Sequence, residues 1–65
     1  MIEIKIENKV LSAKGLELIN KYFMVEMKGA KYISFKVSGE MSLLRFTGII
    51  ASLGIKAKYI KTKSI

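Results

Sequence analysis

The chain has 65 residues and contains neither cysteine nor histidine, which excludes disulfides, thiolate chemistry and the commonest zinc ligand. Twelve basic residues against five acidic ones give a net charge of +7. This balance favours polyanionic partners such as nucleic acid, although surface lysines also serve plain solubility. A single domain of this size buries only about 60% of its unfolded surface, so we expect association with another subunit to add stability.

Membrane insertion and secretion are not expected from the sequence. The longest apolar stretch, residues 43–55, is interrupted by Arg45 and two glycines and falls short of a span of about 20 residues. The N-terminus alternates charges instead of forming a secretory signal, so we expect a cytoplasmic protein. No internal repeat, low-complexity run or linker is predicted. The absence of glutamine and cysteine beside many lysines and isoleucines is typical of thermophilic proteins.

The first half of the chain predicts a strand followed by a helix. Residues 1–7 alternate isoleucine with charged residues, which indicates a strand with one buried face. Ser12 is a candidate N-cap, and apolar residues at helical spacing predict a helix over residues 13–27. A small apolar cluster near the end of this helix is interpreted as core filling: Met24, Val25 and Met27.

The second half predicts a strand at residues 31–37, a helix within residues 38–54 and a strand at residues 55–62. Ser38 or Ser42 is the candidate N-cap of this second helix, and Gly54 suits the left-handed position after its end.

The second helix is apolar nearly all round. We therefore expect it to contact a sheet on one side and a partner subunit on the other. A narrow stripe with small side chains is the predicted dimer interface: Leu44, Gly48 and Ala51. The alternative is that this stripe packs against the first helix of the same subunit.

The element order predicts an α/β two-layer sandwich with the order β-α-β-α-β. Strands joined through helices are usually parallel, so we expect a mainly parallel three-stranded sheet in the order 1-2-3, with both helices on one face. The opposite face of that sheet is predicted to carry mostly polar side chains: Glu3, Lys5, Glu7, Tyr32, Ser34, Lys36, Lys56, Lys58 and Ile60.

Motifs for catalysis are nearly absent. The sequence has no dinucleotide, phosphate-loop or nucleophile-elbow motif, and it has no aspartate as well as no cysteine or histidine. We predict no catalytic residue, no metal ligand and no cofactor. The remaining enzymatic alternative is a subunit whose partner supplies the missing chemistry.

Basic residues predict contacts to a nucleic-acid backbone. In a parallel sheet, Lys9, Lys14 and Lys36 meet at one edge, beside helix N-termini that favour phosphate. The full predicted contact set is Lys9, Lys14, Lys36, Arg45, Lys56, Lys58, Lys61 and Lys63. Tyr32 on the open sheet face can stack a base. The alternatives are a solvated charged rim for the lysines, and a place in a dimer interface or over a sheet edge for Tyr32.

The layout resembles the Alba family of archaeal chromatin proteins. The matching parts are the basic loop Asn8-Lys9-Val10-Leu11-Ser12-Ala13-Lys14 and the step Lys36-Val37-Ser38-Gly39 into the second helix. The resemblance implies a homodimer that holds nucleic-acid backbone through Lys9, Lys14 and Lys36. The sequence departs from the family at Glu40, where arginine often follows that glycine.

Two function classes follow from the sequence. The first is a small basic protein that binds DNA or RNA through the phosphate backbone, without sequence specificity, as a homodimer. The alternative is a protein-interaction or assembly module, such as one from a virus or mobile element, whose charge serves solubility alone. Clustering of the lysines on one face favours the first class, whereas an even spread favours the second.

Overall fold

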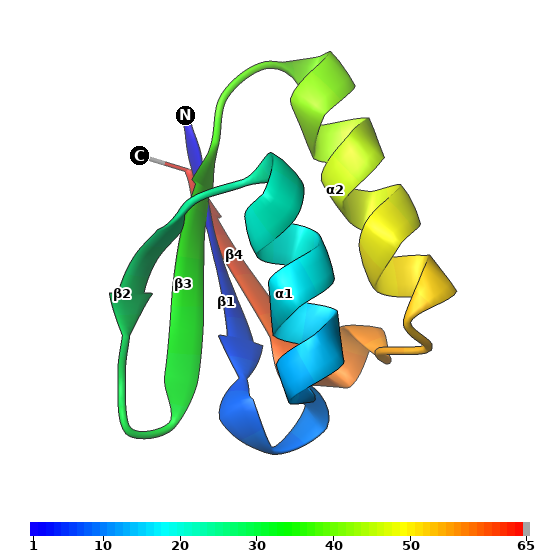
Figure 1. Cartoon of the computed structure of the whole chain (residues 1–65). Helices are drawn as coiled ribbons and strands as arrows, with labels where there is room; N and C mark the ends of the chain where they lie inside the picture. The colour runs from blue at the N-terminus through cyan, green and yellow to red at the C-terminus, as the bar shows by residue number, and fades with distance from the viewer. Residues whose placement is uncertain (65) are drawn as a thin grey trace.

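The computed structural model describes residues 1–64, and these residues form one four-stranded sheet covered by two α-helices (Figure 1). The elements in chain order are β1 (Ile2–Glu7), η1 (Asn8–Val10), α1 (Ala13–Tyr22), β2 (Val25–Lys28), β3 (Tyr32–Val37), α2 (Glu40–Ser52), η2 (Ala57–Tyr59) and β4 (Ile60–Ser64), where η denotes a short 3-10 helix.

The sheet is antiparallel throughout and has the order β2-β3-β1-β4, so the predicted parallel three-stranded sheet is wrong. The difference arises because two strands, β2 and β3, lie between the helices where one was predicted. The extra strand reverses the direction in which β3 crosses the sheet, and β3 pairs antiparallel with β1. The resulting α+β topology, β-α-β-β-α-β, is the ferredoxin-like or split β-α-β arrangement.

The prediction missed β2 because this edge strand buries little. The helix predicted to reach residue 27 ends at Tyr22, and Phe23 is already extended, with φ of −135°. Along β2 only Val25 is partly buried, and the apolar–charged alternation of this strand spans only four residues, which is too short to be separated from the apolar spacing of the preceding helix. Met24 and Met27 are 83% and 65% exposed, so their interpretation as core filling is wrong.

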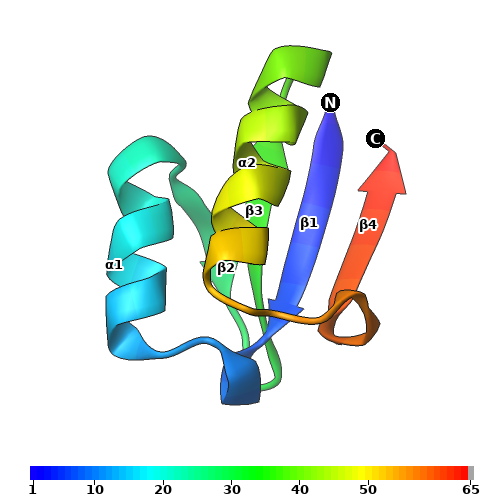
Figure 2. The same cartoon turned by 90° about the vertical axis from the view of Figure 1, so that its right-hand side faces the viewer.

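The core lies between the sheet and the helices, which cover the same sheet face (Figure 2). The alternating isoleucines of β1 enter it as predicted. Phe46 of α2 is central, because its ring contacts Phe23 at 5.2 Å and Phe35 at 5.4 Å between centroids. The buried apolar residues are Ile4, Ile6, Ile19, Ile33, Phe35, Val37, Phe46 and Ile50.

The helix ends agree with the sequence at two positions and differ at one. The hydroxyl of Ser12 accepts a hydrogen bond from the amide of Gly15 at 3.0 Å, which confirms the predicted N-cap of α1. Gly54 follows α2 with φ of +74°, a left-handed conformation that glycine adopts without strain. The N-cap of α2 is Gly39, which makes no side-chain bond, so the predicted serine cap is wrong.

The last strand begins later than predicted. Residues 57–59 form η2, and Ile60 opens β4 by pairing with Ile6. Ile60 therefore packs against the core, and its predicted place on the open face is wrong. No helix within residues 1–64 has the length and apolarity needed to cross a membrane.

Candidate nucleic-acid interface

In Figure 1, β1 finishes at the same end of the sheet at which β3 and β4 begin, and the segments that meet at this end are rich in lysine. The chain reaches this end in three segments, residues 7–14, 28–31 and 53–59. We call it the basic end, and define it by its six lysines: Lys9, Lys14, Lys28, Lys31, Lys56 and Lys58. The same segments contain one acidic residue, Glu7, whose carboxylate lies 3.5 Å from the Lys9 ammonium.

Asn8 holds two of these segments together. Its side-chain amide donates to the carbonyl oxygens of Gly29 and Ala30 at 2.9 and 3.1 Å. Its backbone amide donates to the carbonyl oxygen of Lys31 at 2.8 Å. These bonds attach the turn between β2 and β3 to the end of β1. Lys9 and Lys31, which are distant in sequence, are thereby held on adjacent parts of the basic end.

Two tyrosine rings lie at the basic end, and each has two lysines close to it. The Lys31 and Lys61 ammonium groups lie 5.5 and 5.3 Å from the centroid of the Tyr32 ring. Around Tyr59, the corresponding distances are 5.3 Å for Lys9 and 5.1 Å for Lys58. These separations are within the range of cation–π attraction. Aromatic and cationic groups are thus interleaved along this end.

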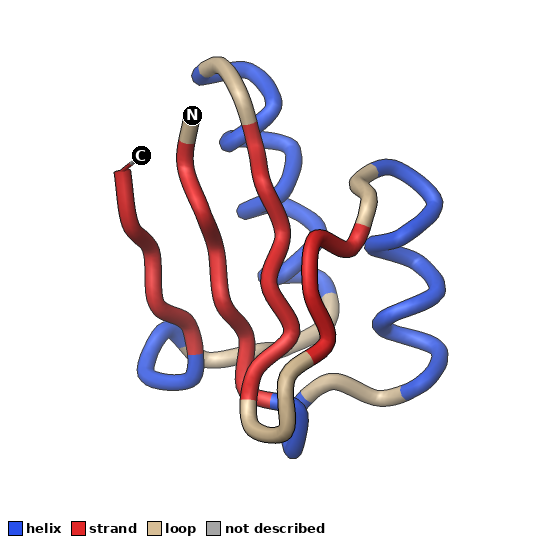
Figure 3. The backbone as a smooth tube through the Cα atoms, turned by 90° about the vertical axis from the view of Figure 1, so that its left-hand side faces the viewer, coloured by secondary structure: helices blue, strands red, loops and turns tan. Residues whose placement is uncertain are grey.

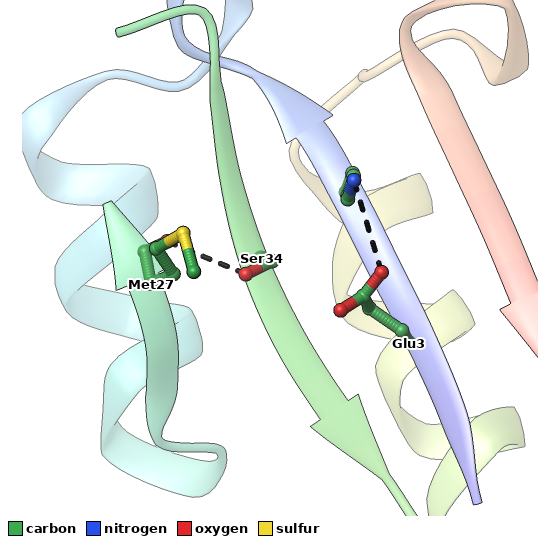
Figure 4. Close-up of polar contacts among 4 residues, drawn as sticks. Glu3, Met27 and Ser34 are labelled. Atoms are coloured by element: carbon green, nitrogen blue, oxygen red, sulfur yellow. Dashed lines mark hydrogen bonds and ion pairs between the residues drawn. The ribbon is translucent and has the colours of Figure 1, made fainter. Parts of the chain in front are cut away.

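The sheet face opposite the helices, which faces the viewer in Figure 3, adjoins the basic end and carries lysines together with glutamates. Lys5 pairs in register with Lys61, and Glu3 pairs with Lys63, so these side chains share that face. Lys5 lies 3.8 Å from Glu3, while the nearby Ser34 hydroxyl donates to the Met27 carbonyl at 3.5 Å (Figure 4). Exposed ion pairs of this kind stabilise little, so these lysines can change partner at low cost.

Shallow hollows lie around these residues. One, of about 270 Å³, is lined by Glu3, Lys5, Lys61, Thr62 and Lys63. A second, of about 220 Å³, lies beside Tyr32 and is also lined by Lys5, Met27 and Ser34. Open, lysine-lined hollows suit an extended polyanion better than an enclosed small molecule.

The predicted contact residues do not all come together. Lys9, Lys14, Lys56 and Lys58 lie at the basic end, and Lys61 and Lys63 lie on the adjoining open face. Lys36 is at the opposite end of β3, opposite Glu3 and 3.1 Å from Glu26, so its predicted meeting with Lys9 and Lys14 is wrong. The antiparallel sheet is the reason, since β1 and β3 finish at opposite ends. Arg45 is exposed on α2.

The predicted dimer stripe lies on the outer side of α2. Leu44 is 68% exposed, and Ala51 is exposed as well. A methyl group added at Gly48 would meet no atom within 4 Å among the described residues, so this stripe does not pack against α1. The alternative of contact within the same subunit is therefore wrong, and the stripe is available to a partner.

The predicted contact set left out Lys5, Lys28, Lys31 and Tyr59, although Lys5 was expected on the open sheet face, where it lies. For Lys31 and Tyr59, a signal was present. The tetrapeptide Ala-Lys-Tyr-Ile occurs at residues 30–33 and again at residues 57–60, so the prediction of no internal repeat is wrong.

Neither a metal site nor a relative identifies the function. Within residues 1–64, no three side chains of the metal-binding types cluster closely enough to hold an ion. In comparisons with known proteins, no family model matches the chain, and no curated protein or solved structure shows significant similarity to it.

Proposed function

We propose that this chain binds nucleic acid through the phosphate backbone, without reading base sequence, and that it does so as a homodimer. The observation that carries the proposal is the clustering at the basic end. Six of the twelve basic residues lie in its three segments, against one of the five acidic residues. Lys5 and Lys61 extend the same surface over the open sheet face, whereas Lys63, like Lys36, lies opposite Glu3 towards the other end of the sheet.

Lysine suits this role because its ammonium is a mobile point charge on a flexible stem. It neutralises phosphates wherever they lie and carries no pattern that reads base edges. Binding of this kind releases counterions, so its affinity falls steeply with salt. The proposal includes the cytoplasmic location expected from the sequence. It does not depend on the resemblance to the Alba family.

The homodimer part of the proposal rests on the outer stripe of α2. Leu44 offers exposed apolar surface, and Gly48 lets a second helix approach closely because no side chain stands between the backbones. A second copy of the same helix is the proposed partner.

The second candidate function is a protein-assembly module with no role in nucleic-acid binding. The observation that favours it is exposed apolar surface at the end opposite the basic end, where Tyr22, Met24 and Met41 are all more than half exposed. Such surface often marks contact with another protein.

Fluorescence anisotropy with labelled random-sequence duplex and single strand, titrated at several salt concentrations, tests the proposal. If all six lysines of the basic end engage, the slope of log affinity against log salt is about −5 for the duplex and about −4 for the single strand. An absence of binding at the lowest salt would reject nucleic-acid binding and leave the assembly module.

A further inference from the structure

The repeated tetrapeptide has a structural counterpart in the sheet. Each copy continues to a lysine three residues after its isoleucine, so residues 30–36 and 57–63 share the pattern Ala-Lys-Tyr-Ile-x-x-Lys. The copies lie on β3 and β4, the two strands that flank β1. Ile33 and Ile60 both pair with Ile6, and the lysines that close the two copies both pair with Glu3. The repeat therefore places like residues in like registers on both sides of β1.

The repeat contributes to the core through its two isoleucines. Ile33 is buried and Ile60 packs against the buried cluster. The tyrosines are only partly buried, and four lysine ammonium groups lie within 5.1 to 5.5 Å of their ring centroids. Core packing explains the two isoleucines of the repeat, but it does not explain why Tyr32 and Tyr59 each have two lysines beside the ring.

We infer that Tyr32 and Tyr59 form two stacking sites for the bases of a single-stranded nucleic acid, whose phosphates are held by the lysines around the rings. This inference rests on the proposed function and names its substrate class. Aromatic rings on a sheet, interleaved with basic groups, are the usual means by which proteins hold single strands.

Stacking on two separate rings favours a single strand over a duplex. Tyr32 begins β3 and Tyr59 directly precedes β4, and β1 lies between these two strands, so the rings belong to elements that are not adjacent in the sheet. In a duplex the base faces are covered by their neighbours, whereas a flexible single strand can turn two bases outwards onto the rings.

The lysines above the rings are compatible with this use. Each contributes one weak cation–π contact on the exposed surface, which stabilises less than the stacking of a base on the ring. Lys31 and Lys58 each precede their tyrosine in the chain, so they can move to a phosphate while the ring receives the base. Lys9 and Lys61 approach the rings from neighbouring segments and supply a second cation at each site.

The test compares three labelled ligands at one salt concentration: a twelve-nucleotide oligothymidine, a strand of twelve abasic deoxyribose phosphates, and a random duplex. We expect the oligothymidine to bind most tightly. Tyr32→Leu and Tyr59→Leu should each weaken its binding by about 5- to 150-fold, the range expected for loss of one stacked base, and leave binding of the abasic strand unchanged. Tyr32→Phe and Tyr59→Phe, which keep the ring, should retain the affinity.

Tyr22→Leu is the matched control, because Tyr22 is an exposed tyrosine of α1 outside the repeat. In Tyr22→Phe the remaining tyrosines are Tyr32 and Tyr59, so quenching of tyrosine fluorescence by oligothymidine reports stacking directly. Equal affinity for oligothymidine and the abasic strand, without quenching, would overturn the stacking sites and leave phosphate binding intact. Failure of all three ligands to bind would overturn the proposed function and this inference together.

Discussion

Four lysines of the basic end, Lys9, Lys31, Lys56 and Lys58, lie in the connections between its α-helices and strands, whereas the connections at the opposite end, residues 23–24 and 38–39, contain none. That opposite end instead exposes apolar side chains: Met1, Tyr22, Met24 and Met41. We call it the apolar end. The difference teaches that a chain of 65 residues can separate two surfaces of distinct chemistry by assigning them to opposite ends of one sheet. We propose polyanion binding at the first surface, and the second candidate function, protein assembly, would use the second.

Both ends depend on the packing of the Phe46 ring in the core, and removing this ring should unfold the domain and with it both surfaces. Phe46→Ala removes a buried ring that contacts Phe23, near the apolar end, and Phe35 in the sheet. The expected loss is about 3–5 kcal/mol of the free energy of unfolding, close to the whole stability of a small domain. Urea denaturation followed by circular dichroism measures it. A variant that unfolds at the same urea concentration as the original chain would show that the ring is not central.

The charge difference between the ends is tested by two double variants that each remove two positive charges. Lys31→Gln with Lys58→Gln at the basic end should reduce the salt slope of binding by about 2, and the affinity at 0.1 M salt by about 60-fold. Lys21→Gln with Arg45→Gln, both on exposed helix positions, is the control and should change the slope little. Equal losses in the two variants would mean that net charge, and not its location, drives binding.

Self-association through α2 is tested at Leu44. Leu44→Lys should weaken the dimer by about 1.5–3 kcal/mol for each copy, because an exposed leucine no longer becomes buried at the interface. Sedimentation velocity at several protein concentrations reports the change. Met27→Lys, on β2, removes a similarly exposed apolar side chain outside the stripe and should leave the oligomeric state unchanged. A monomeric original chain would reject the dimer itself.

The order of the basic end depends on Asn8. Asn8→Ala removes the two side-chain hydrogen bonds to the β2–β3 turn and should cost about 1–2 kcal/mol of stability. Amide hydrogen exchange should accelerate in the turn at residues 28–31 more than at residues 38–39 of the apolar end. Asn20→Ala, in the exposed part of α1, provides the comparison and should be neutral or slightly stabilising because alanine favours helices. Uniform acceleration at both ends would contradict a local role.

The smallest expected effect is at Gly48. Gly48→Ala should stabilise the monomer by about 1 kcal/mol, since glycine disfavours a helix interior and the added methyl group meets no atom within 4 Å. For a domain of this size, that raises the melting temperature by about 4–8 °C in calorimetry at low concentration. Gly54→Ala is the contrast and should destabilise by about 1 kcal/mol, because φ at this position is +74°. A lower melting temperature for Gly48→Ala would indicate a side chain or helix packed against it.

Local patterns in the sequence were sufficient for several elements. The strict alternation of β1, the N-cap at Ser12 and the left-handed glycine at Gly54 each depend on residues within a few positions of one another. The open, partly basic sheet face follows from the same alternation in β1 and β3, since successive side chains of a strand point to opposite faces.

The tertiary structure alone decided the path of the chain across the sheet. The short edge strand β2 is held by backbone pairing with β3, and its four alternating residues alone do not distinguish a strand from the last turn of a helix. Because β2 was not predicted, the predicted direction of β3 was reversed, and Lys36 was expected at the wrong end of the sheet. For the same reason, the prediction did not bring Lys31 close to Asn8, or Lys9 close to Tyr59. The sequence by itself therefore determined the charge, the buried face of β1 and the N-cap of α1, while non-local strand pairing decided which of the lysines share one end of the molecule.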